Sequence, residues 1–121
     1  MMKKILIADD EPNIIMSLEY TFRKNGFEVF IARDGNEALD ILKTQVPDIA
    51  LLDIMMPGVD GYSILEYIRA DTTLTGCRVV FLSAKNKETD IEKGLSLGAD
   101  AYLTKPFSIK KLVEKINELI Q

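Results

Sequence analysis

Short apolar runs alternate along the chain with segments whose apolar residues recur at helical spacing. The runs are mostly unbroken stretches of aliphatic and β-branched residues, which is typical of strands covered on both faces of a sheet. The strands predicted in this way are Ile5–Ala8, Glu28–Ala32, Ile49–Leu52, Arg78–Leu82 and Ala101–Thr104.

The segments between the apolar runs predict five helices. In the first, Ile14, Leu18 and Phe22 recur every four residues, while Pro12 suits a first helical turn and Gly26 suits the end. The apolar positions of the other four helices are Ala38, Leu39, Ile41 and Leu42; Ile64, Leu65 and Ile68; Ile91 and Leu95; and Leu112, Ile116 and Leu119.

Capping residues bound several of these helices. Asp34, with Glu37 three residues later, suits the start of the second helix, and Asp60 and Ser108 suit the third and fifth. Gly98 suits the end of the fourth. Because parallel strands need helical crossovers, the alternation predicts an α/β fold, a doubly wound parallel five-stranded sheet in a three-layer sandwich. No linker divides residues 1–121, which predicts a single domain.

Composition narrows the range of functions. The chain has 121 residues, with 15 Lys and Arg against 19 Asp and Glu, and a formal net charge of −4. This acidity argues against direct binding of nucleic acid, which needs clustered Lys and Arg. The sequence contains no His, which excludes Ser-His-Asp triads, His-based zinc sites and imidazole catalysis within this chain.

The start of the chain and its cysteine usage indicate a cytoplasmic protein. Lys3 and Lys4 precede an apolar run, as in a signal peptide, but the run stops at Asp9 and is too short for a signal or a membrane span. We therefore interpret Lys4–Ala8 as a buried strand and expect no membrane association. The single Cys77 cannot form an internal disulfide, which suits a reducing compartment.

Polar residues follow four of the predicted strands. Because parallel strands all point the same way, these residues gather at one edge of the sheet, where ligands of such folds bind. They are Asp9, Asp10 and Glu11 after the first strand, Asp53 after the third, Ser83 after the fourth and Lys105 after the fifth.

Three carboxylates at one edge predict a metal site. Two carboxylates about 4 Å apart repel by roughly 4 kcal/mol at an effective dielectric of about 20, so Asp9, Asp10 and Asp53 need protons or a cation. Oxygen ligands without His or clustered Cys favour Mg²⁺, which commonly completes its shell with phosphoryl oxygens. Lys105 and Ser83 would then bind a phosphoryl group, and a central carboxylate makes an aspartyl phosphate the natural covalent species.

Each of these residues also has a structural interpretation when it is taken alone. A carboxylate after a strand can cap a helix or shape a turn, a serine often ends a strand, and a lysine is usually solvated. Tyr102 and Cys77 suit packing positions. The joint placement of the polar residues at one edge, in this chain order, favours the functional interpretation.

The segments Lys4–Glu11, Asp48–Gly58, Asp60-Gly61 and Gly98–Phe107 carry a specific pattern of residues and spacings. Together they resemble the receiver domains of two-component response regulators. The similarity extends over nearly the whole chain, to the final helix. It implies a flavodoxin-like fold with strand order 2-1-3-4-5.

The resemblance implies a role for each residue around Asp53. Asp53 is expected to be the phosphoacceptor. Asp10 and Asp53 are expected to bind Mg²⁺ directly, together with the backbone carbonyl of Met55, and Asp9 through a metal-bound water. Mn²⁺ is an expected substitute for Mg²⁺.

The resemblance also implies a phosphoryl-binding and switching group. Ser83 is expected to hydrogen-bond to a phosphoryl oxygen and Lys105 to pair with the phosphoryl group, with a cis Lys105–Pro106 peptide bond. Tyr102 is the expected switch aromatic, which turns inward as the Ser83 loop moves. Glu11 aligns with an acidic position beside the metal pair.

The implied activity is transfer of a phosphoryl group to Asp53 from a phosphohistidine on a sensor histidine kinase or a phosphotransfer protein. The chain would be a phosphoacceptor signalling domain and not an enzyme, although it catalyses its own phosphotransfer and dephosphorylation. Phosphorylation adds roughly −1.5 to −2 charge. It is expected to switch the face of the fourth helix, fifth strand and fifth helix toward an output domain, a downstream protein or a homodimer.

Three other functions fit the residues less well. A degenerate receiver that serves only for docking is opposed by the presence of every expected site residue. A Mg²⁺-dependent phosphatase needs a second acid soon after Asp53, and Ile54–Met56 offers none. A dinucleotide-binding domain needs a glycine-rich turn where Asp9–Glu11 stand.

Overall fold

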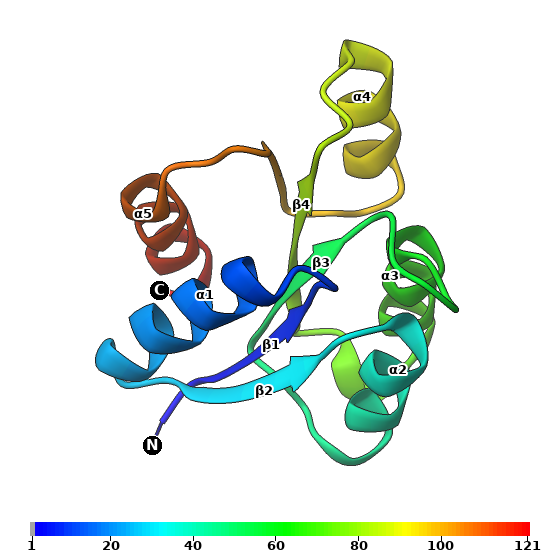
Figure 1. The fold of residues 1–121 in the computed structure, drawn as a ribbon. Helices are drawn as coiled ribbons and strands as arrows, with labels where there is room; N and C mark the ends of the chain where they lie inside the picture. Colours follow the sequence, from blue (N-terminus) through cyan, green and yellow to red (C-terminus); the bar gives the residue numbers. More distant parts are fainter. Residues whose placement is uncertain (1) are drawn as a thin grey trace.

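Five parallel strands form the central sheet of the computed structural model, which describes residues 2–121 (Figure 1). Within these residues the order is β2-β1-β3-β4-β5, which confirms the predicted doubly wound topology. The strands are β1 Lys4–Ala8, β2 Glu28–Ala32, β3 Ile49–Asp53, β4 Arg78–Ser83 and β5 Ala101–Thr104.

A helix lies between each pair of consecutive strands, as the parallel arrangement requires, and a last helix follows β5. The helices are α1 Pro12–Lys24, α2 Gly35–Thr44, α3 Gly61–Ala70, α4 Glu88–Ser96 and α5 Ile109–Ile120, with a short 3₁₀-helix η1 Thr72–Leu74 that the sequence analysis did not predict. The predicted N-caps are confirmed. The side chains of Asp34, Asp60 and Ser108 accept hydrogen bonds from backbone N–H groups three residues later at 2.9, 2.9 and 3.3 Å.

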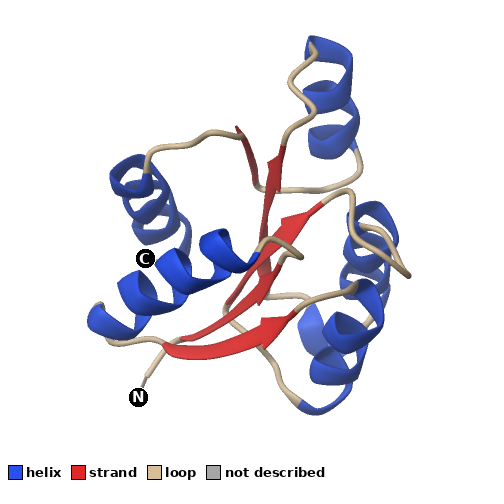
Figure 2. Ribbon diagram, viewed as in Figure 1, coloured by secondary structure: helices blue, strands red, loops and turns tan. Residues whose placement is uncertain are grey.

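The helices cover both faces of the sheet and give three layers (Figure 2). On one face α1 and α5 pack over the sheet, with Leu18, Phe22, Leu112 and Ile116 buried. On the other face α2 and α3 bury their apolar stripes. Full burial of each Leu, Ile or Phe stabilises the fold by about 1.5–3 kcal/mol.

Two strands extend one residue further than the apolar pattern predicts. Asp53 and Ser83 were expected just after their strands, yet Asp53 pairs with Leu82 and Ser83 pairs with Thr104. Strand pairing is made by backbone groups and therefore continues through a polar residue. Both side chains consequently project from rigid strand ends.

Helix α4 is the least embedded of the helices and extends outward near the end of β4 (Figure 1). Within Glu88–Ser96, Gly94 is the one buried residue, and Leu95 is 44% exposed although its spacing predicted a core position. A β-carbon at Gly94 would lie 3.0 Å from the Tyr102 ring and 3.1 Å from the Phe81 ring. The glycine thus allows α4 to approach the sheet at this point.

Arg69 joins the end of α3 to the turn between α4 and β5. Its guanidinium donates to the backbone oxygens of Gly98 and Cys77 and, at 2.9 Å, to the carboxylate of Asp100. Asp100 in turn accepts from the backbone N–H of Val79 at 2.8 Å. This network fixes the end of α4 that is remote from the polar edge.

In residues 2–121, no helix combines the length and apolarity needed to cross a lipid bilayer.

Candidate functional site

The carboxyl ends of β1, β3 and β5 bring the predicted charged residues together. Asp9 and Asp10 follow β1, Asp53 ends β3, and Lys105 follows β5. One carboxylate oxygen from each of Asp9, Asp10 and Asp53 lies within 4.8 Å of the others. The predicted acidic cluster therefore forms at the predicted edge.

Asp9 is the most deeply buried member of this acidic cluster, with 1% of its surface exposed. Its Oδ1 accepts a hydrogen bond from the backbone N–H of Glu11 at 2.9 Å. Among residues 2–121, its Oδ2 has no hydrogen-bond partner and has an ion-pair contact with Lys105 Nζ at 3.0 Å. Asp10, in contrast, is exposed.

Asp53 is also buried, with 5% of its surface exposed. Its Oδ1 accepts a hydrogen bond from the backbone N–H of Met55 at 3.3 Å. Burial raises the pKa of Asp53 to about 6, with Lys105 opposing this rise and the charges of Asp9 and Asp10 adding to it. A poorly solvated carboxylate with a raised pKa suits attack on an electrophile.

Lys105 is the cation of the site and contacts three carboxylates. Its Nζ lies 2.8 Å from Glu11 Oε1, 3.0 Å from Asp9 Oδ2 and 3.5 Å from Asp53 Oδ2. Burial lowers the pKa of Lys105, but the hydrogen bond to Glu11 and the nearby charges of Asp9 and Asp53 outweigh it, so the pKa is raised. The ammonium is therefore charged at neutral pH. The Lys105–Pro106 peptide bond is cis, as the resemblance implied.

The donor atoms fit a hard divalent cation. Three carboxylates converge, and the buried Asp9 Oδ2, which contacts the Lys105 ammonium, has a second lone pair that a cation or its water would satisfy. The formal charge of Asp9, Asp10, Glu11, Asp53 and Lys105 together is −3, because four carboxylates face one ammonium. Oxygen ligands of this kind suit Mg²⁺.

Ser83 and Tyr102 lie on the neighbouring strands β4 and β5. Ser83 is fully buried, and its hydroxyl accepts a hydrogen bond from the backbone N–H of Lys85 at 3.1 Å. Within residues 2–121, this hydroxyl makes no hydrogen bond to the acidic cluster. Tyr102 is half-buried, and its hydroxyl donates to the backbone oxygen of Lys85 at 2.7 Å. The loop after β4 thus connects the two residues.

The loop from Ile54 to Asp60 is fixed by close backbone contacts. The N–H of Gly61 donates to the carbonyl oxygen of Ile54 at 2.9 Å. A β-carbon at Gly61 would lie 2.6 Å from the carbonyl oxygen of Asp53, so no other residue fits there without movement. Met55 is 62% exposed on this loop.

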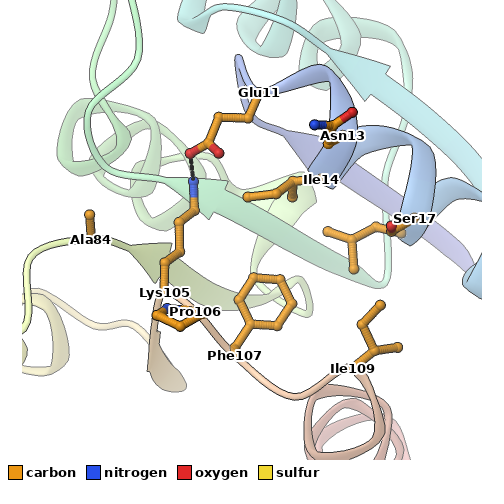
Figure 3. Close-up of a pocket in the computed structure, with 10 residues that line it drawn as sticks. Glu11, Asn13, Ile14, Ser17, Ala84, Lys105, Pro106, Phe107 and Ile109 are labelled. Atoms are coloured by element: carbon orange, nitrogen blue, oxygen red, sulfur yellow. Dashed lines mark hydrogen bonds and ion pairs between the residues drawn. The ribbon is translucent and has the colours of Figure 1, made fainter.

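A cleft of about 460 Å³ lies beside the site, between α1 and the segment that follows β5 (Figure 3). Ile14, Phe107 and Ile109 contribute apolar walls, and the Glu11–Lys105 ion pair stands at one end. A partner that fills this cleft would come directly against the functional edge.

Three features of the site region were not predicted from the sequence. The Glu11–Lys105 ion pair was not predicted, although Glu11 was noted as acidic. An edge-to-face aromatic series also joins Tyr62 to Phe81 and Phe81 to Tyr102, with ring centroids 5.6 and 6.1 Å apart. Lys93 lies 4.3 Å from the Tyr62 ring and links α4 to α3. Aromatic residues on separate elements gave no periodic signal that could have revealed this contact.

Comparison with known proteins agrees with this geometry. The profile of the response regulator receiver domain matches residues 5–117. The Francisella response regulator 1452 receiver domain is 38% identical, with a TM-score of 0.90 over 98% of this chain and 96% of that one. The Thermotoga maritima response regulator TrrA, in complex with Mg²⁺-BeF, is 34% identical, with a TM-score of 0.84 over 98% and 99%. The Vibrio cholerae chemotaxis response regulator CheY4 is 26% identical, with a TM-score of 0.91 over 98% and 99%.

Proposed function

Since this chain belongs to the response regulator receiver domain family, we propose that it accepts a phosphoryl group on Asp53 and thereby switches an output partner. The observation that carries the proposal is the arrangement of Asp53 within reach of Lys105 and of two further carboxylates. In this role the chain is a phosphoacceptor that promotes its own modification, and not an enzyme with a separate substrate.

The donor in this proposal is a phosphohistidine on a sensor histidine kinase or a phosphotransfer protein. The sequence contains no His, so the donor imidazole comes from another protein or another domain. An oxygen of Asp53 attacks phosphorus, the phosphorus–nitrogen bond of the donor breaks, and the imidazole leaves with the electron pair. Such a reaction depends on positioning and charge neutralisation more than on further covalent chemistry.

Lys105 and Ser83 are the proposed partners of the transferred group. The Lys105 ammonium is already 3.5 Å from Asp53 Oδ2, so a phosphoryl group on that carboxylate would meet it directly. Ser83 ends the strand beside Asp53 and would reach the phosphoryl oxygens after the loop that follows β4 moves.

Mg²⁺ is the proposed cofactor, held by Asp10 and Asp53 with the backbone carbonyl of Met55, and by Asp9 through water. The buried Asp9 oxygen, which accepts no hydrogen bond among residues 2–121, and the convergence of three carboxylates support this assignment. The similar TrrA structure contains Mg²⁺ and BeF. When bound, Mg²⁺ would supply positive charge that stabilises the phosphoryl group in transfer. Mn²⁺ remains a proposed substitute on grounds of its similar preference for oxygen ligands.

The proposed output surface is the face formed by α4, β5 and α5. A groove of about 410 Å³ runs along it, lined by Ile91, Leu95, Tyr102 and Leu103 together with two lysines. The limited burial of α4 allows it to shift at small energetic expense. An output domain, a downstream protein or a second copy of the chain would bind there after phosphorylation. We also propose a cytoplasmic location, since the lone buried thiol suits a reducing compartment.

The experiment that tests the proposal is incubation with acetyl phosphate, with and without Mg²⁺, followed by intact mass measurement. We expect a Mg²⁺-dependent gain of one phosphoryl group in the wild type and none in Asp53→Asn. We expect Lys105→Ala to retain some phosphorylation but to lose phosphorylation-dependent partner binding. Absence of the mass gain, with acetyl phosphate and again with a phosphorylated histidine kinase, would refute the phosphoacceptor role and favour a docking module.

A further inference from the structure

The shortest contact of the Lys105 ammonium is with Glu11, a residue outside the acidic cluster. The distance from Nζ to Glu11 Oε1 is 2.8 Å, compared with 3.0 Å to Asp9 and 3.5 Å to Asp53. Figure 3 shows the ion pair of Lys105 with Glu11. The two residues are 94 positions apart in the chain and meet across the edge of the sheet. Lys105 is thus held from both sides.

The three carboxylates differ in what they do when a divalent cation binds. Asp9 and Asp53 belong to the cluster that would hold the cation. Their charge would then be largely neutralised, and the ammonium would face a cation instead of two free carboxylates. Glu11 is outside that cluster, and its side chain is 56% exposed. Glu11 would therefore remain a partner of the ammonium after the cation binds.

The backbone holds Glu11 in a position from which it can reach Lys105. Its N–H donates to Asp9 Oδ1 at 2.9 Å, and its carbonyl oxygen accepts from the N–H of Ile15 at 3.1 Å. Glu11 is the N-cap residue of α1, but its side chain makes no capping hydrogen bond. The carboxylate instead extends across the end of the cleft to the ammonium (Figure 3).

We propose that Glu11 is the positioning residue of Lys105. It keeps the ammonium at the rim of the acidic cluster, within reach of a phosphoryl group on Asp53, after Mg²⁺ has taken up the cluster carboxylates. The inference rests on the proposed function for the importance of this position, but the ion pair itself can be tested without phosphorylation. Glu11 is not one of the three clustered carboxylates and would act through Lys105.

Without Glu11, the long side chain of Lys105 would be free to move into solvent or the cleft when the cation binds. Phosphoryl transfer would still occur, because Asp53 and the metal ligands are intact. It would proceed without an ordered Lys105 ammonium beside Asp53. We expect Glu11→Gln to slow phosphorylation by about tenfold, which is less than the roughly 100-fold or greater effect of removing an electrostatic catalytic group.

The direct test is nuclear magnetic resonance of the lysine ammonium groups in ¹⁵N-labelled protein. An ammonium held in an ion pair exchanges its protons slowly enough to give a proton–nitrogen correlation, whereas a solvated ammonium does not. The Lys105 signal is assigned by its loss in Lys105→Arg. In the wild type we expect this signal both without Mg²⁺ and with saturating magnesium chloride. In Glu11→Gln we expect it to disappear when Mg²⁺ is added.

Two further variants test whether the position of the Glu11 carboxylate, and not only its negative charge, holds the Lys105 ammonium. Glu11→Asp keeps the negative charge but shortens the side chain by one methylene, so it should resemble Glu11→Gln if the contact matters. Glu19→Gln removes a carboxylate from the same helix, one that pairs with Arg23 at 3.0 Å. It should leave both the Lys105 signal and the phosphorylation rate unchanged.

The proposal is overturned if wild-type protein lacks the Lys105 signal, or if Glu11→Gln keeps it in saturating Mg²⁺. It is also overturned if Glu11→Asp behaves as the wild type, because charge alone would then suffice. A wild type that shows the ammonium signal but gains no phosphoryl group would refute the proposed function and leave the positioning role supported.

Discussion

Replacing Asp53 by Asn should stabilise the metal-free protein at neutral pH. The buried carboxylate has a pKa raised from 3.8 to about 6, so its ionised form is disfavoured in the folded state. Asn has the same shape without the charge, and its oxygen can still accept the hydrogen bond from the Met55 N–H. The substitution thus removes an electrostatic penalty and leaves the packing unchanged.

The size of the effect follows from the change in pKa. A rise of about 2 pH units corresponds to up to about 3 kcal/mol at pH 7.5, because each unit is worth about 1.4 kcal/mol. Lys105 loses one of its three carboxylate partners in the variant, so we expect a gain of about 1 to 3 kcal/mol. In a chain of 121 residues, 1 kcal/mol corresponds to about 4 °C in Tm.

The pH dependence identifies the cause of the stabilisation. Between the unfolded pKa near 4 and the folded pKa near 6, the native state binds more protons than the unfolded state, so the stability of the wild type falls as pH rises. The penalty is complete above about pH 7 and shrinks as pH falls. The stability difference between Asp53→Asn and wild type should therefore be about 2 kcal/mol smaller at pH 4.5 than at pH 7.5.

Urea unfolding followed by circular dichroism, in EDTA at both pH values, measures this difference. Any fixed effect of the amide cancels when the two pH values are compared. Asp71→Asn is a matched control of opposite sign, because hydrogen bonds from Thr73 lower the pKa of the exposed Asp71. That variant should lose stability at neutral pH and approach the wild type as pH falls. An Asp53→Asn difference that is the same at pH 4.5 and 7.5 would refute the reasoning.

Three further predictions concern residues that pack or connect the secondary-structure elements. Gly61→Ala should destabilise the fold by about 1 to 3 kcal/mol through backbone overlap, whereas Gly76→Ala, with open space around its β-carbon, should be neutral in the same urea assay. Burial raises the pKa of Cys77 to about 12, so a thiol reagent should label it slowly at pH 8 in native protein and rapidly in urea; rapid native labelling would contradict this burial. Arg69→Lys should lower the free energy of unfolding by about 1 to 3 kcal/mol, because a lysine cannot contact Gly98 and Asp100 of the α4–β5 turn and the carbonyl oxygen of Cys77 at the same time.

Much of the fold could be predicted because the sheet is covered on both faces. Strands such as Ile49–Asp53 are buried along their whole length, and this burial requires the unbroken apolar runs that the sequence contains. The predicted ends of β3 and β4 were one residue short of the observed ends, because backbone pairing continues past the last apolar side chain. Helix α4 was predicted from Ile91 and Leu95, but its weak burial was not, since the spacing of apolar residues does not reveal what packs against them.

The members of the candidate site could also be predicted, because parallel strands force Asp9, Asp53 and Lys105 to the same edge. The ion-pair partners of Lys105 within the site could not be predicted. Whether Lys105 turns to Asp9, Asp53 or Glu11 depends on side-chain directions and distances of a few tenths of an ångström. The sequence pattern carries no information at that scale.

The metal-free site carries uncompensated negative charge, and this charge favours the binding of a cation. Four carboxylates and one ammonium leave an excess of negative charge around a buried Asp53, which destabilises the ionised nucleophile relative to water. Binding of a divalent cation relieves part of this repulsion, so the excess negative charge of the folded protein favours cation binding. A phosphoryl group on Asp53 would add negative charge, which the cation and Lys105 would offset. A better-balanced cluster would make the fold more stable but would bind the cation less strongly. The same burial that raises the pKa of Asp53 therefore also favours binding of the cation that its proposed modification requires.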